Sequence, residues 1–65
     1  MVAKEVGKKL VALRGKKSQQ EVAEAAGITQ AALSMYERGE RIPRDAVKIR
    51  LANYYGRTVG DIFFS

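Results

Sequence analysis

Apolar side chains recur every three or four residues along most of the chain, in segments separated by single glycines. In the first segment lysines fill the positions between the apolar residues, which predicts an amphipathic helix over about residues 2–14, ended by Gly15. The apolar positions of this segment are Val2, Val6, Leu10 and Leu13.

Capping residues predict two short helices in the middle of the chain. Ser18 and Glu21 have the spacing of a capping box, so a second helix begins at Ser18 and continues to Gly27, a residue suited to a left-handed C-terminal cap. Thr29 is a second N-cap, from which a third helix runs from Gln30 to about Glu37. Only Gly27 and Ile28 separate the two helices before this cap.

Two further helices complete the prediction. Ile42-Pro43 breaks the chain, and we expect Pro43 in the first turn of a fourth helix that ends near Tyr55. The wide apolar arc of this helix implies burial on two sides. Thr58 and Asp61 repeat the capping signature for a last helix over residues 58–64. The apolar residues of the fourth helix are Ala46, Val47, Ile49, Leu51, Ala52, Tyr54 and Tyr55.

No segment alternates like a strand, so residues 1–65 are predicted to form a single all-α domain of five helices. The composition contains no Cys and no His, which removes disulfides, thiolate or imidazole metal ligands, and most catalytic nucleophiles and bases. We therefore expect no enzyme, no metal and no cofactor. No apolar stretch approaches the length of a membrane span or a signal peptide, so the expected location is the cytoplasm.

The charge distribution suggests a polyanionic partner. The net charge is +5, and the basic residues gather in residues 1–17 and 38–50, on either side of an acidic stretch over residues 18–37. Nucleic acid is the commonest partner of such a domain, although the same charge would also serve solubility.

Two short helices joined by a glycine-containing turn, in a small basic all-α domain, are typical of a helix-turn-helix, whose second helix enters the DNA major groove. The residues that carry a closer likeness are Ser18-Gln19-x-x-Val22-Ala23-x-x-Ala26-Gly27-Ile28-Thr29-Gln30-x-x-Leu33-Ser34-x-Tyr36-Glu37-x-Gly39-x-x-x-Pro43, Leu51-Ala52-x-x-Tyr55-Gly56 and Ile62. This pattern resembles the phage-repressor (Cro/C1, xenobiotic-response-element) helix-turn-helix family over nearly the whole chain. The resemblance implies a five-helix, lambda-repressor-like DNA-binding domain.

The resemblance also assigns candidate phosphate contacts. Gln19 matches the family glutamine that clamps a phosphate, and Ser18 lies beside it at a helix N-terminus, where free amides favour an anion. The alternative is that Ser18 only caps the helix and Gln19 is solvated. Basic residues on both sides of the motif, of which we expect about three to touch the DNA backbone, are Lys16, Lys17, Arg38, Arg41 and Arg44.

The candidate base readers lie on the third helix. They are Gln30, Ala31, Ser34 and Met35, with Ala32 at the margin. Gln30 can bond adenine as a bidentate pair, whereas Met35 offers apolar contact or instead packs against a neighbour. This helix has no charge from Ile28 to Tyr36, so affinity must come from the flanking residues.

Other residues are expected to have structural roles. Leu33 and Tyr36 would lie in the core, and Glu37 resembles the family carboxylate that is buried against an arginine of the first helix, here Arg14. The candidate dimer interface is Phe63, Phe64 and Tyr55. These residues could instead complete the protomer core, but two adjacent phenylalanines on a short helix cannot both point inward, so at least one is expected at the interface, and helical spacing does not show which. A two-fold dimer would place its recognition helices about 34 Å apart on a palindromic operator.

The sequence therefore predicts a homodimeric, sequence-specific repressor that binds double-stranded DNA, with no small-molecule site evident and no membrane partner. An antitoxin-like protein-interaction module that binds DNA only for autoregulation is the alternative. A membrane-active polycation built on the first helix is a third reading, which the well-specified caps and turns disfavour.

Overall fold

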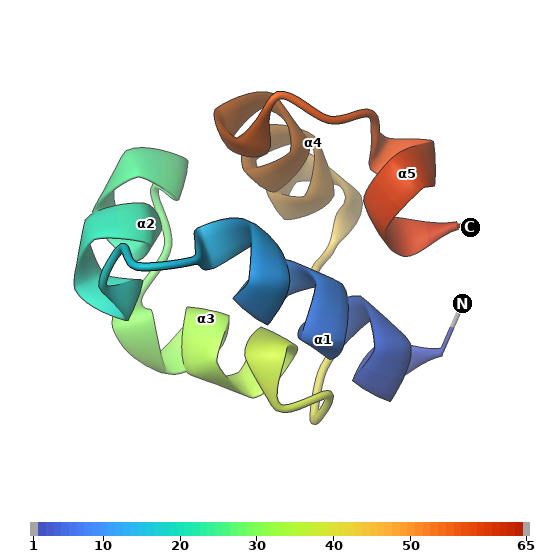
Figure 1. Cartoon of the computed structure of the whole chain (residues 1–65), viewed down its shortest axis with the longest axis horizontal. Helices are drawn as coiled ribbons and strands as arrows, with labels where there is room; N and C mark the ends of the chain where they lie inside the picture. Colours follow the sequence, from blue (N-terminus) through green and yellow to red (C-terminus); the bar gives the residue numbers. More distant parts are fainter. Residues whose placement is uncertain (1, 65) are drawn as a thin grey trace.

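The computed structural model describes residues 2–64 and contains five α-helices within them (Figure 1). The helix α1 packs against α3 and α5, α2 packs against α3 and α4, and α4 packs against α5. The predictions of an all-α fold and of five helices are confirmed, and the helices are α1 (Ala3–Arg14), α2 (Gln19–Ala26), α3 (Gln30–Glu37), α4 (Asp45–Tyr55) and α5 (Val59–Phe63).

Three of the helices begin at the predicted side-chain caps. The Ser18 hydroxyl accepts a hydrogen bond from the amide of Glu21, and Thr29 caps α3 in the same way. At α5 the box is complete, because Thr58 accepts from the amide of Asp61 and the Asp61 carboxylate accepts from the amide of Thr58. At α2, within residues 2–64, the structure gives only the Ser18 half of the predicted box.

The turn between α2 and α3 depends on Gly27. Its torsions, φ 70° and ψ 34°, lie in the left-handed region that residues with a Cβ disfavour. The amide of Gly27 donates to the carbonyl of Glu24, and the amide of Ile28 donates to the carbonyl of Ala23. These two bonds form a Schellman motif, which ends α2 and leaves Thr29 in position to cap α3.

The core gathers apolar residues from all five helices. Leu33 and Tyr36 belong to it as predicted, and Phe63 fills its C-terminal end with 1% of its surface exposed. The core residues are Val6, Leu10, Val22, Ala23, Ala26, Leu33, Tyr36, Val47, Leu51, Ala52, Ile62 and Phe63.

Two expectations for the fourth helix are wrong. Pro43 does not lie in its first turn but precedes the N-cap residue, Arg44. The helix is also buried on one side only, since Ile49 is 52% exposed and Ala46 is exposed as well. The neighbours of α4 are α2 and α5, which cover its inner face and leave the face carrying Ile49 uncovered.

The helices α1 and α3 approach each other closely at Gly7. A Cβ at this position would lie 2.3 Å from the carbonyl oxygen of Glu37 and 2.9 Å from that of Tyr36. Because any side chain would push the backbones apart, glycine is required here by space. The sequence pattern gave no sign of this requirement, since Gly7 lies inside a regular helix.

Candidate nucleic-acid interface

A chain of polar contacts joins α1, α2 and α3 beneath the proposed DNA-binding surface. The Arg14 guanidinium donates to the Glu37 carboxylate through Nε at 2.7 Å and Nη2 at 3.1 Å. The amide of Gln19 donates to the same carboxylate at 2.8 Å, and Gln30 donates to the carbonyl oxygen of Gln19 at 3.5 Å. The buried Glu37 carboxylate therefore positions Gln19, a predicted phosphate contact. Gln19 in turn contacts Gln30, a predicted base reader.

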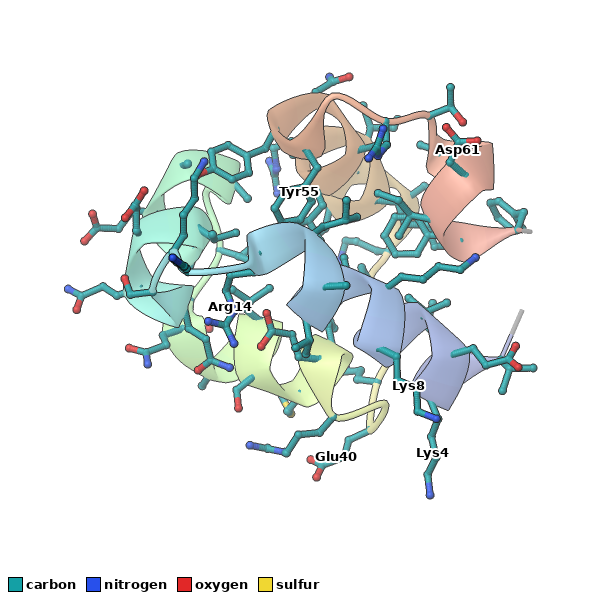
Figure 2. The ribbon with its side chains drawn as sticks, in the orientation of Figure 1. Lys4, Lys8, Arg14, Glu40, Tyr55 and Asp61 are labelled. Atoms are coloured by element: carbon teal, nitrogen blue, oxygen red, sulfur yellow. The ribbon has the colours of Figure 1, made fainter. Side chains whose placement is uncertain are left out.

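Arg14 also closes the short link between α1 and α2. Its Nη1 donates to the carbonyl of Lys17 at 2.8 Å. The hydrogen bond to Glu37 raises the pKa of Arg14 above its ordinary value, so the guanidinium is charged at neutral pH. Figure 2 shows Arg14 at the C-terminal end of α1, facing α3. The link is short, and the structure nevertheless forms the expected ion pair across it.

The surface of α3 is accessible at its start and uncharged. Gln30 and Ala31 are exposed, and Ser34 and Met35 are half-buried. Ala32 is also partly buried but packs against the core, so it belongs to the opposite side of the helix. This surface can offer amide, hydroxyl and methyl groups to base edges in a major groove.

The predicted phosphate contacts are placed in different ways. Ser18 is exposed beside half-buried Gln19, and Lys16, Arg41 and Arg44 are exposed with no ion pair to the described part of the chain. In contrast, Lys17 turns toward α4. Its ammonium donates to the Tyr54 hydroxyl at 3.1 Å and lies 4.8 Å from the centre of the Tyr54 ring, and the hydrogen bond raises the pKa of Lys17.

Arg38 is the predicted phosphate contact with the most protein partners. Its Nε and Nη2 donate to the two carboxylate oxygens of Glu40, at 2.9 and 3.1 Å, and its Nη1 donates to the hydroxyl of Ser34. The ion pair raises the pKa of Arg38 and lowers that of Glu40. Glu40 lies in the turn after α3, on the same side of the molecule as Lys4 and Lys8 (Figure 2).

The predicted dimer interface must be corrected at Phe63. Its ring is in the protomer core, so Phe63 has no surface to offer a partner, whereas Phe64 is 61% exposed. The Lys48 ammonium lies 4.9 Å from the centre of the Phe64 ring, and the Lys48 side chain is itself buried. Tyr55, the third predicted interface residue, is half-buried.

Sequence reasoning assigned no polar contact to Lys48, Glu40 or Tyr54. Lys48 stands three residues after Asp45, and their charged groups lie 3.6 Å apart, so helical spacing was the available signal. No such spacing identifies Tyr54, which meets Lys17 only through the fold. Glu40 follows Arg38 by two residues outside a helix, where sequence spacing does not predict an ion pair.

A shallow apolar groove of about 260 Å³ is lined by residues of which none is predicted to contact DNA. None of the helices within residues 2–64 is long and apolar enough to cross a membrane. In the same part of the chain, no three His, Cys, Asp or Glu side chains are grouped in a way that could hold a metal ion. The groove is lined by Lys9, Ala12, Leu13, Arg57, Asp61 and Ile62.

Comparison with known proteins identifies a family and several similar structures. A helix-turn-helix family model, HTH_3, matches residues 8–62. Two crystal structures of the clp gene regulator ClgR from Corynebacterium glutamicum are similar to this chain, with TM-scores of 0.84 and 0.80 and 25% sequence identity. Each alignment covers 95% of this chain, and the shares of the ClgR chains covered are 68% and 83%. No curated protein sequence matches this chain.

Proposed function

Because the chain belongs to the Cro/C1-type helix-turn-helix family, we propose that it is a transcriptional repressor that binds a palindromic operator as a homodimer. The similarity to ClgR, a gene regulator, supports a regulatory role. Repression is the simplest mode, since a small DNA-binding domain on a promoter blocks access to it. A protein with this partner acts where the DNA lies, which we propose is the cytoplasm.

The observation that carries this proposal is the uncharged, accessible surface of α3 beside exposed cations. Gln30 and Ser34 offer hydrogen bonds to bases, while Lys16, Arg41 and Arg44 are free to meet phosphates. Gln19, held by Glu37, presents its amide at the start of α2, where backbone amides also favour an anion. Affinity and sequence preference thus come from different residues.

The salt dependence of DNA binding tests this division. If the two subunits make about six to ten phosphate contacts, log K should fall with log salt at a slope of about −5 to −9. Fluorescence anisotropy with a labelled inverted repeat, taken from the DNA upstream of the gene, measures the slope. A slope near zero contradicts DNA binding as the function.

Paired substitutions test which residues read bases. Gln30→Ala should remove the preference at one base pair of each half-site, whereas Arg41→Ala should weaken binding to all sequences equally. Gln19→Ala should also weaken all sequences, but it releases Gln30 as well, because the two amides are bonded. Arg41→Ala is therefore the cleaner backbone control, and identical behaviour of the Gln30 and Arg41 variants would refute the division.

A further inference from the structure

We propose that Arg38 and Glu40 form a neutral clasp that fixes the Ser34 hydroxyl as a hydrogen-bond donor to a base. Arg38 is then a positioning residue for sequence recognition, not a phosphate contact. This inference rests on the proposed function, and it deepens it by naming what selects one base pair.

The geometry of the clasp is specific. Two parallel bonds of 2.9 and 3.1 Å join the Arg38 guanidinium to the Glu40 carboxylate, the bidentate arrangement that most restricts an arginine. The third bond, from Nη1, reaches the Ser34 hydroxyl on the last turn of α3. The backbone of Glu40 is held as well, since its amide donates to the carbonyl of Met35 at 3.0 Å.

The charge of the clasp argues against a phosphate role. The Glu40 carboxylate neutralises the Arg38 guanidinium, so the pair releases few counterions when it approaches DNA. If Arg38 moved to a phosphate, Glu40 would remain as an unpaired negative charge next to the DNA backbone. Arg41, only one residue beyond Glu40, has no such neutralising partner among residues 2–64.

The chemistry of the hydroxyl sets what it can read. Its oxygen already accepts a bond from a cation, which makes the hydroxyl a stronger donor and a weaker acceptor. In the major groove it then bonds to an acceptor atom, such as guanine O6 or N7, adenine N7 or thymine O4, and not to the amino groups of adenine or cytosine, so the position of these groups decides which base pair fits. Ser34 lies one helical turn after Gln30, so it reads a neighbouring base pair of the same half-site.

The test compares a charge-balanced variant with a matched charge-removing one. Arg38→Ala/Glu40→Ala leaves the net charge unchanged, whereas Arg41→Ala removes one positive charge. Wild type, Ser34→Ala and these two variants are titrated, at several salt concentrations, with the preferred operator and with operators carrying the other three base pairs at each half-site position.

The clasp predicts a specific pattern. Ser34→Ala identifies the base pair that Ser34 reads, by loss of about fivefold or more in discrimination there. The Arg38→Ala/Glu40→Ala variant should lose the same preference with an unchanged salt slope, and adding Ser34→Ala to it should have no further effect. Arg41→Ala should reduce the slope by about one for each contact removed and keep the preference.

Three results would overturn the clasp. The first is an Arg38→Ala/Glu40→Ala variant that keeps full discrimination at the base pair found with Ser34→Ala, and the second is a Ser34→Ala variant that changes no preference. The third is a salt slope that falls in the double variant as it does in Arg41→Ala, because this would make Arg38 a phosphate contact. If wild type itself showed no sequence preference, the proposed function would fail together with the clasp, which distinguishes that outcome from failure of the clasp alone.

Discussion

At the scale of single residues, Tyr55 places a polar group where the described part of the chain offers it no hydrogen bond. Within residues 2–64 its hydroxyl is the one side-chain polar atom that is buried without a hydrogen-bond partner. Burial, together with the negative charge of Glu37, raises its pKa from 10.0 to about 12. A buried hydroxyl without a partner costs stability, which removing the oxygen recovers.

Replacing Tyr55 by Phe tests how much the unpaired hydroxyl costs in stability. At neutral pH the variant should be as stable as wild type or more stable, by up to about 1 kcal/mol, because the ring remains and the unpaired oxygen is gone. In wild type the folded protein favours the neutral phenol of Tyr55. The contribution of this preference to the free energy of unfolding is fully present below pH 10.0 and is lost as the pH rises toward about 12. Urea unfolding at neutral and alkaline pH measures both effects.

Tyr54→Phe is the matched control, because its hydroxyl accepts from Lys17 and is not an unpaired buried atom. In that variant the alkaline loss of stability due to Tyr55 should remain. An equal loss in Tyr55→Phe and wild type at alkaline pH would show that another group is responsible.

At the scale of helices, the packing of α1 on α3 fixes the position of the recognition helix. Gly7 allows the two backbones to meet at Glu37, and the bonds from Arg14, two turns further along α1, hold the side chain of that same residue. Since Glu37 of α3 also accepts a hydrogen bond from Gln19 at the start of α2, its carboxylate joins the three helices of the site. Disturbing the α1–α3 distance should therefore affect both stability and DNA binding.

Gly7→Ala tests the close approach. Its new methyl group would lie 2.3 Å from a backbone oxygen, which the fold can relieve only by moving a helix, so we expect destabilisation of about 1–3 kcal/mol. The control is Gly60→Ala in α5, where the nearest atom, the Thr58 hydroxyl oxygen, would be 3.7 Å from the methyl group. That variant should gain about 0.5–1 kcal/mol from the reduced entropy of the unfolded chain. Chemical denaturation followed by circular dichroism measures both, and equal effects at the two glycines would contradict the argument.

The helices and their caps were predictable from sequence because their determinants are local. Ser18, Thr29 and Thr58 each cap the helix that the pattern assigned to them, since a cap depends on residues within one turn. The exposed face of α4 was not predictable, because whether Ile49 is covered depends on which helices lie nearby.

The site was predictable only where the family resemblance supplied the roles. The resemblance supplied the pairing of Arg14 with Glu37, which the structure forms, while its phosphate role for Gln19 stays a prediction. No pattern indicated that Arg38 would turn to Glu40 or Lys17 to Tyr54. Lysine and arginine have long, flexible side chains that pair with whichever acceptor the fold brings near, so their partners depend on the tertiary structure and not on the local sequence.

At the scale of the whole molecule, the C-terminal end offers the exposed aromatic ring that a dimer could bury. A chain of 65 residues has a small core, so a partner would add apolar burial that the protomer lacks. Phe64 is 61% exposed, while its neighbour Phe63 completes the core. Substitutions at the two residues therefore have different expected effects, on dimerisation for Phe64 and on the stability of the protomer for Phe63.

Phe64→Ala should weaken dimerisation while leaving the protomer folded, and DNA affinity should then fall steeply because the second half-site is no longer held nearby. Phe63→Ala should instead cost about 3–5 kcal/mol of folding free energy, enough to unfold much of a small domain. Analytical ultracentrifugation and thermal unfolding distinguish the two. A wild type that stays monomeric at tens of micromolar would show that any dimer forms only on DNA.

The absence of charge on α3 from Ile28 to Tyr36 has a consequence for how the protein would locate its operator as cell conditions change. Ionic strength acts on the cation–phosphate contacts, which are the same on every DNA, and leaves the neutral contacts to bases almost unaffected. Plots of log K against log salt for the operator and for scrambled DNA should therefore run parallel. Salt would change how long the protein stays on DNA but not which site it prefers, and lines that converge at high salt would show that a charged group takes part in reading the sequence.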